Sequence, residues 1–183
     1  MFRTGLIALL LMTLAACGFK PMYGSMSGQG RDLDQIMANI RVDDIRDADG
    51  RNSRIGQVIR NNMMSRLRAK GAREAVEYSL KVTFQVEEHG YGFTEDESVT
   101  AQSLKLTALY RLENIATGEK VMEDAARALV TFDLVQSDYS NMVARNAALE
   151  RLSDEVTTRI ATRIGAFFSA NQQRQQKEVA PGQ

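Results

Sequence analysis

Cysteine and histidine, which often carry nucleophilic, redox or metal chemistry, occur once each in this chain of 183 residues, as Cys17 and His89. A lone cysteine cannot form an intramolecular disulfide, and a metal site needs further ligands close by. His89 could serve Ser-His-Asp catalysis, and its acidic neighbours could hold calcium, but one histidine among carboxylates is more typical of a solvated hairpin tip. The spacing of a calcium-binding loop is absent there. The sequence also lacks GxSxG, P-loop, HExxH and CxxC motifs, so we expect no enzymatic activity and no cofactor or metal.

The residues around Cys17 indicate a different chemistry. Arg3 precedes an uncharged run of 12 residues, Gly5 to Ala16. This pattern predicts a cleaved export signal, because spanning a bilayer takes roughly 20 apolar residues. Leu14-Ala15-Ala16-Cys17 resembles the bacterial lipobox, in which the thiol is joined to diacylglycerol and the chain is cut before the cysteine. We therefore predict that Cys17 is a lipidation site.

The residue after the cysteine bears on where such a lipoprotein would reside. Gly18 stands where an aspartate resembles an inner-membrane retention signal in enteric bacteria. Two or three acyl chains would hold the protein firmly, whereas a single chain holds only marginally. We expect the protein at the periplasmic face of the outer membrane. Its 23 basic and 23 acidic side chains balance, which argues against a nucleic-acid partner.

The chain divides into four parts by composition. Residues 1–16 are the predicted signal peptide, and residues 17–34 form a lipidated N-terminus with a tether containing glycine and serine. Residues 35–170 are expected to form a single α/β domain. Residues 171–183 are rich in glutamine and poor in apolar side chains, and we predict a disordered tail there.

Hydrophobic periodicity predicts the elements of that domain. Alternation indicates a first strand over residues 36–42, and helical spacing follows from an N-cap at Ser53 to a stop at Gly71. Three further strands alternate over residues 77–87, 104–112 and 122–134, with a long hairpin loop at 89–97. The last apolar stripe runs from Met142 to Phe167 and predicts a helix ending near Ala170.

The predicted order, β-α-β-β-β-α, belongs to the α+β class. The first two strands should be parallel because a helix connects them, and the last three should form an antiparallel meander. We expect a two-layer sandwich in which two helices cover one face of a four-stranded mixed sheet.

Two surfaces are candidates for binding. The first helix region carries basic but no acidic side chains between Arg51 and Arg73, and we take Arg60, Arg66 and Lys70 as candidate contacts for lipopolysaccharide or an acidic partner. A solvated face balanced by the acidic strands is the alternative, because these charges do not form one stripe around the helix. The second surface is the wet sheet face with its edge strands, since an exposed edge can pair with another sheet.

One stretch resembles a known family. Cys-Gly-Phe-Lys-Pro-Met-Tyr-Gly, residues 17–24, looks like the start of mature lipopolysaccharide-assembly lipoproteins of the LptE family in its alphaproteobacterial form, with Met22 in place of the usual leucine. Residues 145–156, with the following Arg159, Ile160 and Arg163, are similar to that family's last helix. The element order also matches.

The resemblance implies a function. Members of the family sit at the inner leaflet of the outer membrane, plug the LptD β-barrel and assist its assembly and the delivery of lipopolysaccharide to the outer leaflet. The resemblance suggests Phe19, Pro21 and Tyr23 as a segment that docks near the membrane, although these residues could equally pack on the domain. In the family, basic residues are held to contact lipopolysaccharide, and the loop between the second and third strands here has none. An auxiliary lipoprotein of an ABC-type lipid transport system is the alternative function.

Overall fold

Three long antiparallel strands form the centre of the structure, a computed structural model that describes residues 33–68, 75–93 and 99–179. These strands are β3 (Tyr78–Phe93), β4 (Val99–Asn114) and β5 (Lys120–Asp133). Two short strands, β1 (Ile40–Val42) and β2 (Arg46–Asp47), pair in parallel with β3. The strand order is β1-β3-β4-β5, with β2 also beside β3, so β5 lies at the opposite edge of the sheet.

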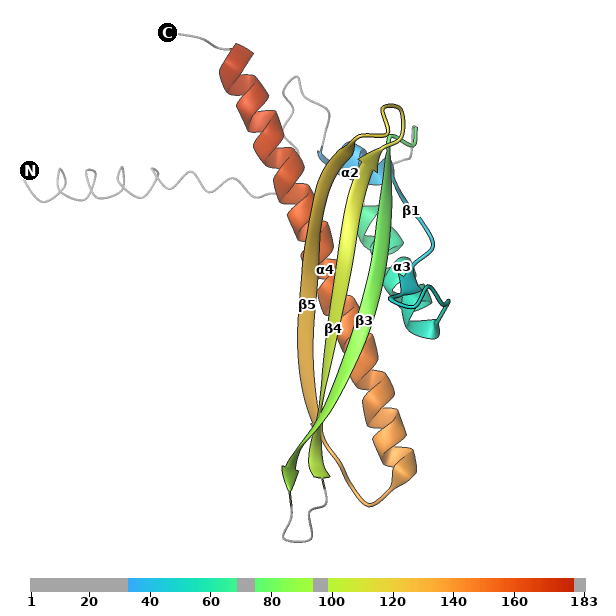
Figure 1. Cartoon of the computed structure of the whole chain (residues 1–183). Coiled ribbons are helices and arrows are strands. Elements are labelled where there is room, and N and C mark those ends of the chain that lie inside the picture. The colour runs from blue at the N-terminus through green and yellow to red at the C-terminus, as the bar shows by residue number, and fades with distance from the viewer. Residues whose placement is uncertain (1–32, 69–74, 94–98, 180–183) are drawn as a thin grey trace, which may run out of the picture.

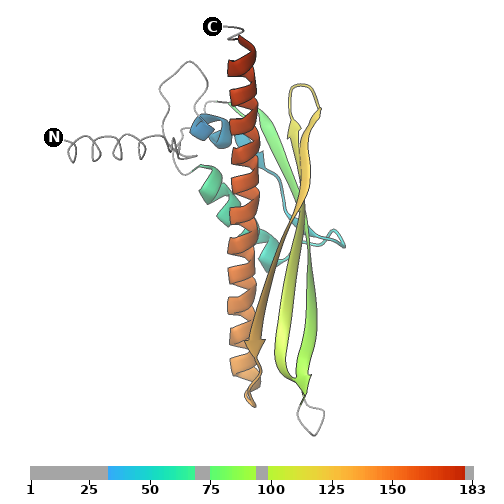
Figure 2. The ribbon, with the colours of Figure 1, turned by 90° about the vertical axis from the view of Figure 1, so that its left-hand side faces the viewer.

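The helices lie on one face of this sheet and make the second layer (Figure 1, Figure 2). They are α2 (Leu33–Ala38), α3 (Arg54–Leu67) and α4 (Asp138–Val179). With 42 residues, α4 is about 60 Å long and crosses the sheet diagonally, packing against α3 and against the strands β5 and β4. The α+β class, the two layers, the parallel pairing of β1 with β3 and the antiparallel meander confirm the sequence prediction, and β2 is an additional short strand.

The core lies between the sheet and the helices α2, α3 and α4. Along each long strand the inward residues alternate with outward ones, as in Leu80, Val82 and Phe84 of β3. The predicted stripe on α4 is buried in its middle part: Leu149, Leu152, Val156, Ile160 and Ile164. On β5 the inward residues include Ala126 and Ala128, whose small side chains leave room for α4 to approach.

The N-terminal strand was predicted too long. Residues 36–38 belong to the helix α2, and only Ile40–Val42 form a strand. Ile36, Met37 and Ala38 are all buried. Three consecutive buried residues do not fit a half-buried strand, in which Met37 would point away from its two neighbours. The short apolar run therefore packs as one turn and a half of helix.

The turn-forming cluster after β1 also contains a strand. Arg46 and Asp47 pair with Thr83 and Phe84 of β3. The turn itself comes next, because one carboxylate oxygen of Asp47 accepts hydrogen bonds from the backbone N–H groups of Asp49 (3.1 Å) and Arg51 (2.8 Å). These bonds hold the pKa of Asp47 below its usual value, chiefly through the Arg51 N–H.

The predicted hairpin loop at 89–97 is shorter than expected. Strand β3 continues through His89 to Phe93 and pairs with β4 as far as the Phe93–Val99 pair. Glycine at 90 and 92 suggests a turn in the sequence, but Gly92 is accommodated within the ladder with a φ of 70°, in the region that favours glycine. His89 is therefore a strand residue, and residues 94–98 lie outside the described ranges.

The final helix was predicted too short. It continues beyond Ala170 to Val179, so residues 171–179, predicted to belong to a disordered tail, are helical. Glutamine, arginine and lysine are good helix formers even without an apolar stripe. Helix propensity therefore extends the element past the part that packs on the sheet (Figure 1).

Helix α3 begins as predicted. The Ser53 hydroxyl accepts a hydrogen bond from the Gly56 N–H at 3.2 Å, which satisfies a donor of the first turn. The helix ends at Leu67, and the predicted stop at Gly71 lies outside the described residues. Gly56 is needed for close packing, because a Cβ there would lie 2.5 Å from the carbonyl oxygen of Ile45. The glycine thus lets α3 press against the segment between β1 and β2.

Candidate anchor and docking surfaces

The predicted anchor region precedes the described part of the chain. Cys17, the lipidation site, and the docking segment Phe19, Pro21 and Tyr23 lie outside it, and so does Lys70. Helix α2, which begins at Leu33, lies at the end of the sheet opposite the β3–β4 hairpin (Figure 1). The chain therefore enters the domain at one end, and the hairpin lies at the other, about 50 Å away along the 16-residue strands.

The arginines of α3 meet carboxylates of the same chain. Arg54 Nη2 lies 3.0 Å from Glu150 Oε1, and Arg66 Nη2 lies 2.5 Å from Asp154 Oδ1. Glu150 and Asp154 are one turn apart on α4, so the two pairs join the outer sides of the two helices. Both pairs are partly solvated, which keeps their contribution to stability small. Arg66, a predicted ligand contact, is held within the domain.

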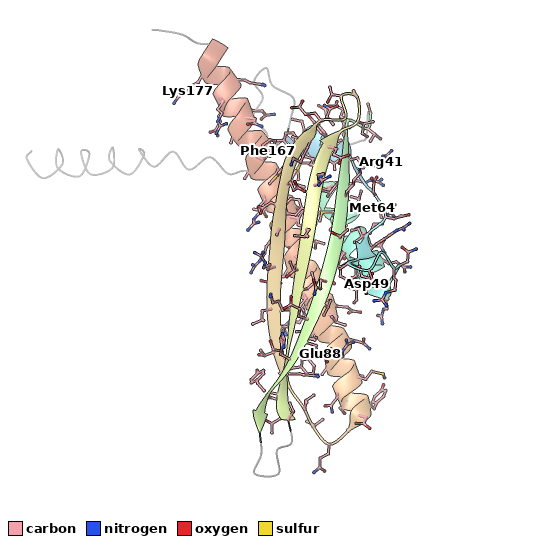
Figure 3. All side chains as sticks on the ribbon, in the orientation of Figure 1. Arg41, Asp49, Met64, Glu88, Phe167 and Lys177 are labelled. Atoms are coloured by element: carbon pink, nitrogen blue, oxygen red, sulfur yellow. The ribbon has the colours of Figure 1, made fainter. Side chains whose placement is uncertain are left out.

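Arg60, the other described candidate, also faces an internal carboxylate. Its Nε lies 3.7 Å from Asp44 Oδ1, beyond hydrogen-bond distance, and this buried atom has no hydrogen-bond partner among the described residues. Arg51 forms ion pairs with Asp47 (3.1 Å) and Asp49 (2.5 Å); Asp49 is labelled beside α3 in Figure 3. The described arginines of this basic region are thus mostly balanced inside the domain, as in the alternative weighed from sequence.

A hollow of about 460 Å³ lies between β3, α4 and the segment before α3. Its lining includes the apolar side chains of Phe84 and Leu149, and Arg51 and Arg145 contribute the cationic groups. Both cations form ion pairs within the domain. Arg51 pairs with Asp47 and Asp49, and Arg145 pairs at 3.0 Å with Glu88, which lies toward the hairpin end of β3 (Figure 3). Among its described lining residues, the hollow therefore offers no unpaired cation to an anionic ligand.

The outer sheet face is a network of ion pairs. Arg111 on β4 lies 2.7 Å from Glu123 on β5, and Lys120 lies 2.8 Å from the same carboxylate. Hydrogen bonds from Lys120 and then Arg111 lower the pKa of Glu123 to about 2. Lys81 and Glu113 form a further pair at 2.6 Å. Cross-strand pairs of opposite charge stabilise an antiparallel sheet modestly.

His89 belongs to this outer face. Its Nε2 lies 3.9 Å from Glu87, which also accepts a hydrogen bond from Lys105 Nζ at 3.0 Å. The Lys105 bond is the main reason why the pKa of Glu87 is below its usual value. Among the described residues there is no group of three or more histidine, cysteine, aspartate or glutamate side chains that could hold a metal ion.

Large apolar side chains gather at the hairpin end of the molecule. Six of them are exposed there, on the last part of β3, the start of β4, the β5–α4 connection and the first turns of α4 (Figure 1), and we call this set the apolar end: Tyr91, Val99, Val135, Tyr139, Met142 and Val143. Tyr139 is 71% exposed and Met142 54%. Met142 was predicted to be part of the buried stripe, and this prediction was wrong. Exposed apolar groups collected in one region are typical of an interaction surface.

The sequence contained only a partial signal for the apolar end. In the sequence, Met142 and Val143 look like further apolar residues of α4. Only the position of the sheet relative to this helix shows that they are exposed. None of the helices in the described ranges is both long and apolar enough to cross a membrane.

Comparison with solved structures shows the same fold in several bacterial lipoproteins. A lipoprotein from Caulobacter crescentus CB15 is 18% identical, with a TM-score of 0.57, over 75% of this chain and 96% of that one. Rare lipoprotein B from Shewanella oneidensis is 9% identical, with a TM-score of 0.54, over 72% of this chain and 99% of that one. Lipoprotein B from Nitrosomonas europaea is 17% identical, with a TM-score of 0.52, over 82% of this chain and 97% of that one.

Sequence comparison adds no family. No family model matches the chain. No curated protein matches it either. At these identities the structural likeness shows the fold, which this chain shares with rare lipoprotein B and related lipoproteins.

Proposed function

We propose that this chain is an outer-membrane lipoprotein, anchored through Cys17 at the periplasmic face, that partners and plugs a large β-barrel of the LptD kind. In this role it assists the assembly of the barrel and the insertion of lipopolysaccharide into the outer leaflet. The observation that carries the proposal is the lipobox with its Cys-Gly-Phe-x-Pro-x-Tyr-Gly opening, on a chain with the fold of rare lipoprotein B.

The shape of the domain supports this function. The domain is a slender two-layer rod (Figure 2). The chain enters at one end of the rod, and exposed apolar side chains lie at the other end. A domain tethered to the inner leaflet through its entry end could direct its apolar end into a partner. We propose that the apolar end, and not the arginines of α3, forms the main contact with the wall of the barrel.

We also propose that lipopolysaccharide contacts the basic residues Arg60, Arg66 and Lys70. Arg66 would have to exchange Asp154 for a phosphate oxygen, and a charge-assisted bond to phosphate is strong enough to compete with a partly solvated ion pair. Reversing the charge of Arg66 and Lys70 together should then reduce lipopolysaccharide binding. If binding is unchanged, these residues are not the contacts.

The partner is tested by affinity purification from outer membranes in mild detergent, with a tag after Gln183 and mass spectrometry of the captured proteins. One large β-barrel in near-stoichiometric yield is the expected result. Capture of ABC transporter or substrate-carrier subunits would instead support the alternative function. A Cys17→Ser variant provides the control, because without lipidation it should be lost from the membrane fraction.

A further inference from the structure

The outer edge of β5 has backbone hydrogen-bonding groups that can be assigned residue by residue. Leu80 of β3 faces β1, since its carbonyl accepts the Asp43 N–H, so even-numbered residues of β3 point to β1 and odd-numbered ones to β4. The odd-numbered residues of β3 pair with odd-numbered residues of β4, so the even-numbered residues of β4 point to β5. These pair with even-numbered residues of β5, as in the Leu106–Ala128 pair, and the even-numbered residues of β5 are therefore the ones bonded to β4. The odd-numbered residues of β5 therefore direct their N–H and C=O groups away from the sheet.

Helix α4 closes the first part of this edge. Arg159 Nη1 donates to the carbonyl oxygen of Arg127 at 2.6 Å, and Arg163 Nη1 donates to that of Ala125 at 2.7 Å. Arg163 is also held by Asp124 at 2.6 Å. These contacts confirm that the odd-numbered carbonyls face outward. They occupy the carbonyl oxygens of Ala125 and Arg127, so at Arg127 the backbone N–H, and not the carbonyl, remains for another strand.

The chain itself closes the other end of the edge. After Asp133, the Leu134 N–H bonds to the Thr100 carbonyl at 2.8 Å. The side-chain amide of Asn141 then binds both backbone groups of Val135, accepting from its N–H (2.9 Å) and donating to its C=O (2.8 Å). The chain is thereby turned away from the sheet toward α4.

Between these two limits the edge is open. In the described part of the chain, the N–H and C=O groups of Leu129 and Thr131 have no hydrogen-bond partner outside the sheet, and neither the Arg127 guanidinium nor the Asp133 carboxylate forms an ion pair. Leu129 is 61% exposed on the outer face. Val130 and Phe132 point inward but are only partly buried against the core. An open strand edge bordered by apolar side chains is a template for pairing with another strand.

We propose that this edge, residues 127–133, pairs with the same edge of a second copy of the chain in an antiparallel, two-fold symmetric arrangement. Outward-pointing residues must face outward-pointing residues, so Leu129 can lie opposite Thr131 of the second copy. In this register Arg127 lies opposite Asp133 of the second copy. Because the arrangement is two-fold symmetric, Asp133 of the first copy also lies opposite Arg127 of the second. On the inner face it places Ala128 opposite Phe132, and Val130 opposite itself.

The charges and sizes of the side chains along this edge favour a second copy of the chain as its partner. The heptapeptide Arg-Ala-Leu-Val-Thr-Phe-Asp is complementary to itself in the antiparallel sense, with opposite charges at its ends and a small side chain facing a large one. Its length matches the window left between Arg159 and the turn at Val135. The pairing does not require the β-barrel partner, so it goes beyond the proposed function and can be tested separately from it.

Disulfide trapping in native membranes tests the register. In the full-length chain, Val130→Cys would put two cysteines opposite each other on the two-fold axis, at a non-hydrogen-bonded position where Cα atoms lie about 4.5 Å apart. This separation is within the range that a disulfide spans. The matched control is Thr131→Cys, whose two copies are diagonal neighbours about 7–8 Å apart. The unsubstituted chain measures the background from Cys17.

The expected result is a disulfide-linked species of twice the chain mass from Val130→Cys on mild oxidation, and little from Thr131→Cys. Equal yields from the two variants, or no such species from Val130→Cys, would overturn the proposal. A linkage to a different protein would overturn it as well, because the edge would then belong to another partner.

Charge reversal within the Val130→Cys background provides the second test. Adding Arg127→Asp or Asp133→Arg alone sets like charges opposite each other twice per pair and should lower the trapped yield about tenfold. Combining both changes should restore the yield, since the ion pairs form with reversed polarity. The backbone carbonyl of residue 127 keeps its bond to Arg159 in every variant. Failure of the combined change to restore trapping would contradict the register.

Discussion

Helix α3 and the apolar end show opposite relations between sequence and surface. The arginines of α3 form the most conspicuous charged stretch in the sequence, yet Arg54, Arg60 and Arg66 each face a carboxylate of the same domain. The apolar end has no comparable sequence signal, and its side chains stand exposed at the far end of the rod. A run of like charge therefore does not identify a binding surface until its partners are known.

Helix α3 and the apolar end also differ in what they contribute to the protein. The pairs of α3 with Glu150 and Asp154 align two helices whose buried sides already contact each other, so they adjust the packing. The apolar end contributes little to the core and remains available to a partner. Changes in α3 should consequently affect folding first, whereas changes in the apolar end should affect association first.

The largest effect is expected in the buried side of α3. Ile59 is fully buried, and Ile59→Ala removes apolar contacts and leaves a cavity, so the free energy of unfolding should fall by about 2–5 kcal/mol. Urea denaturation followed by circular dichroism measures it. Gln57→Ala, at an exposed position of the same helix, should change the value by less than about 0.5 kcal/mol. A small effect at Ile59 would mean that α3 is not an integral part of the core.

The next effect concerns the apolar end. Tyr139→Ser combined with Met142→Ser should reduce recovery of the β-barrel in affinity purification about tenfold, since exposed aromatic and apolar anchors dominate such interfaces. The free energy of unfolding should stay within about 0.5 kcal/mol, because both side chains are exposed. Thr162→Ala, at an exposed position farther along α4, should leave recovery unchanged. If recovery instead depends on Arg66→Glu and not on this double variant, the roles of the two regions are reversed.

A smaller effect is expected for the bond between α3 and α4. A double-mutant cycle with Arg66→Ala and Asp154→Ala should give a coupling of about 0.2–1 kcal/mol in the free energy of unfolding, as the side chains are 35% and 58% exposed. High salt should reduce the coupling. A coupling well above this range would show that the pair is a principal clamp between the helices.

The smallest effect is expected from pH on the outer sheet face. The folded-state pKa of Glu123 is lowered to about 2, so its contribution to stability is complete above the unfolded-state value near 4.5 and is lost as the pH falls from 4.5 toward 2. Urea midpoints at pH 7, 4 and 3 should therefore decline in that order. In Glu123→Gln the decline should be shallower, and an identical decline would mean that other carboxylates account for it.

Much of the fold could be predicted because its signals are local. Alternation from Tyr78 to Val86 and the cap at Ser53 each depend on a few neighbouring residues, and both predictions were confirmed. The run at Ile36 is too short for periodicity to distinguish a turn of helix from a strand. The length of β3 could not be predicted, because pairing with β4 carries the strand through Gly90 and Gly92.

The surfaces were less predictable because they depend on distant partners. Arg66 and Asp154 are 88 residues apart, and only the packing of α3 against α4 brings them together. Met142 fits the helical stripe in the sequence, but the first turns of α4 are not covered by the sheet (Figure 1). The predicted roles of Cys17, Phe19, Pro21, Tyr23 and Lys70 stay predictions.

The most direct measurement is site-specific photo-crosslinking in cells, with a photoreactive amino acid placed at Met142 or, in a second strain, at Gln57 of α3. Both positions are exposed, and they belong to the two surfaces compared above. We expect an adduct with one large outer-membrane β-barrel from Met142 and none from Gln57. An adduct from Gln57 with none from Met142 would contradict the assignment of the docking surface, and no barrel adduct from either would contradict the proposed partner.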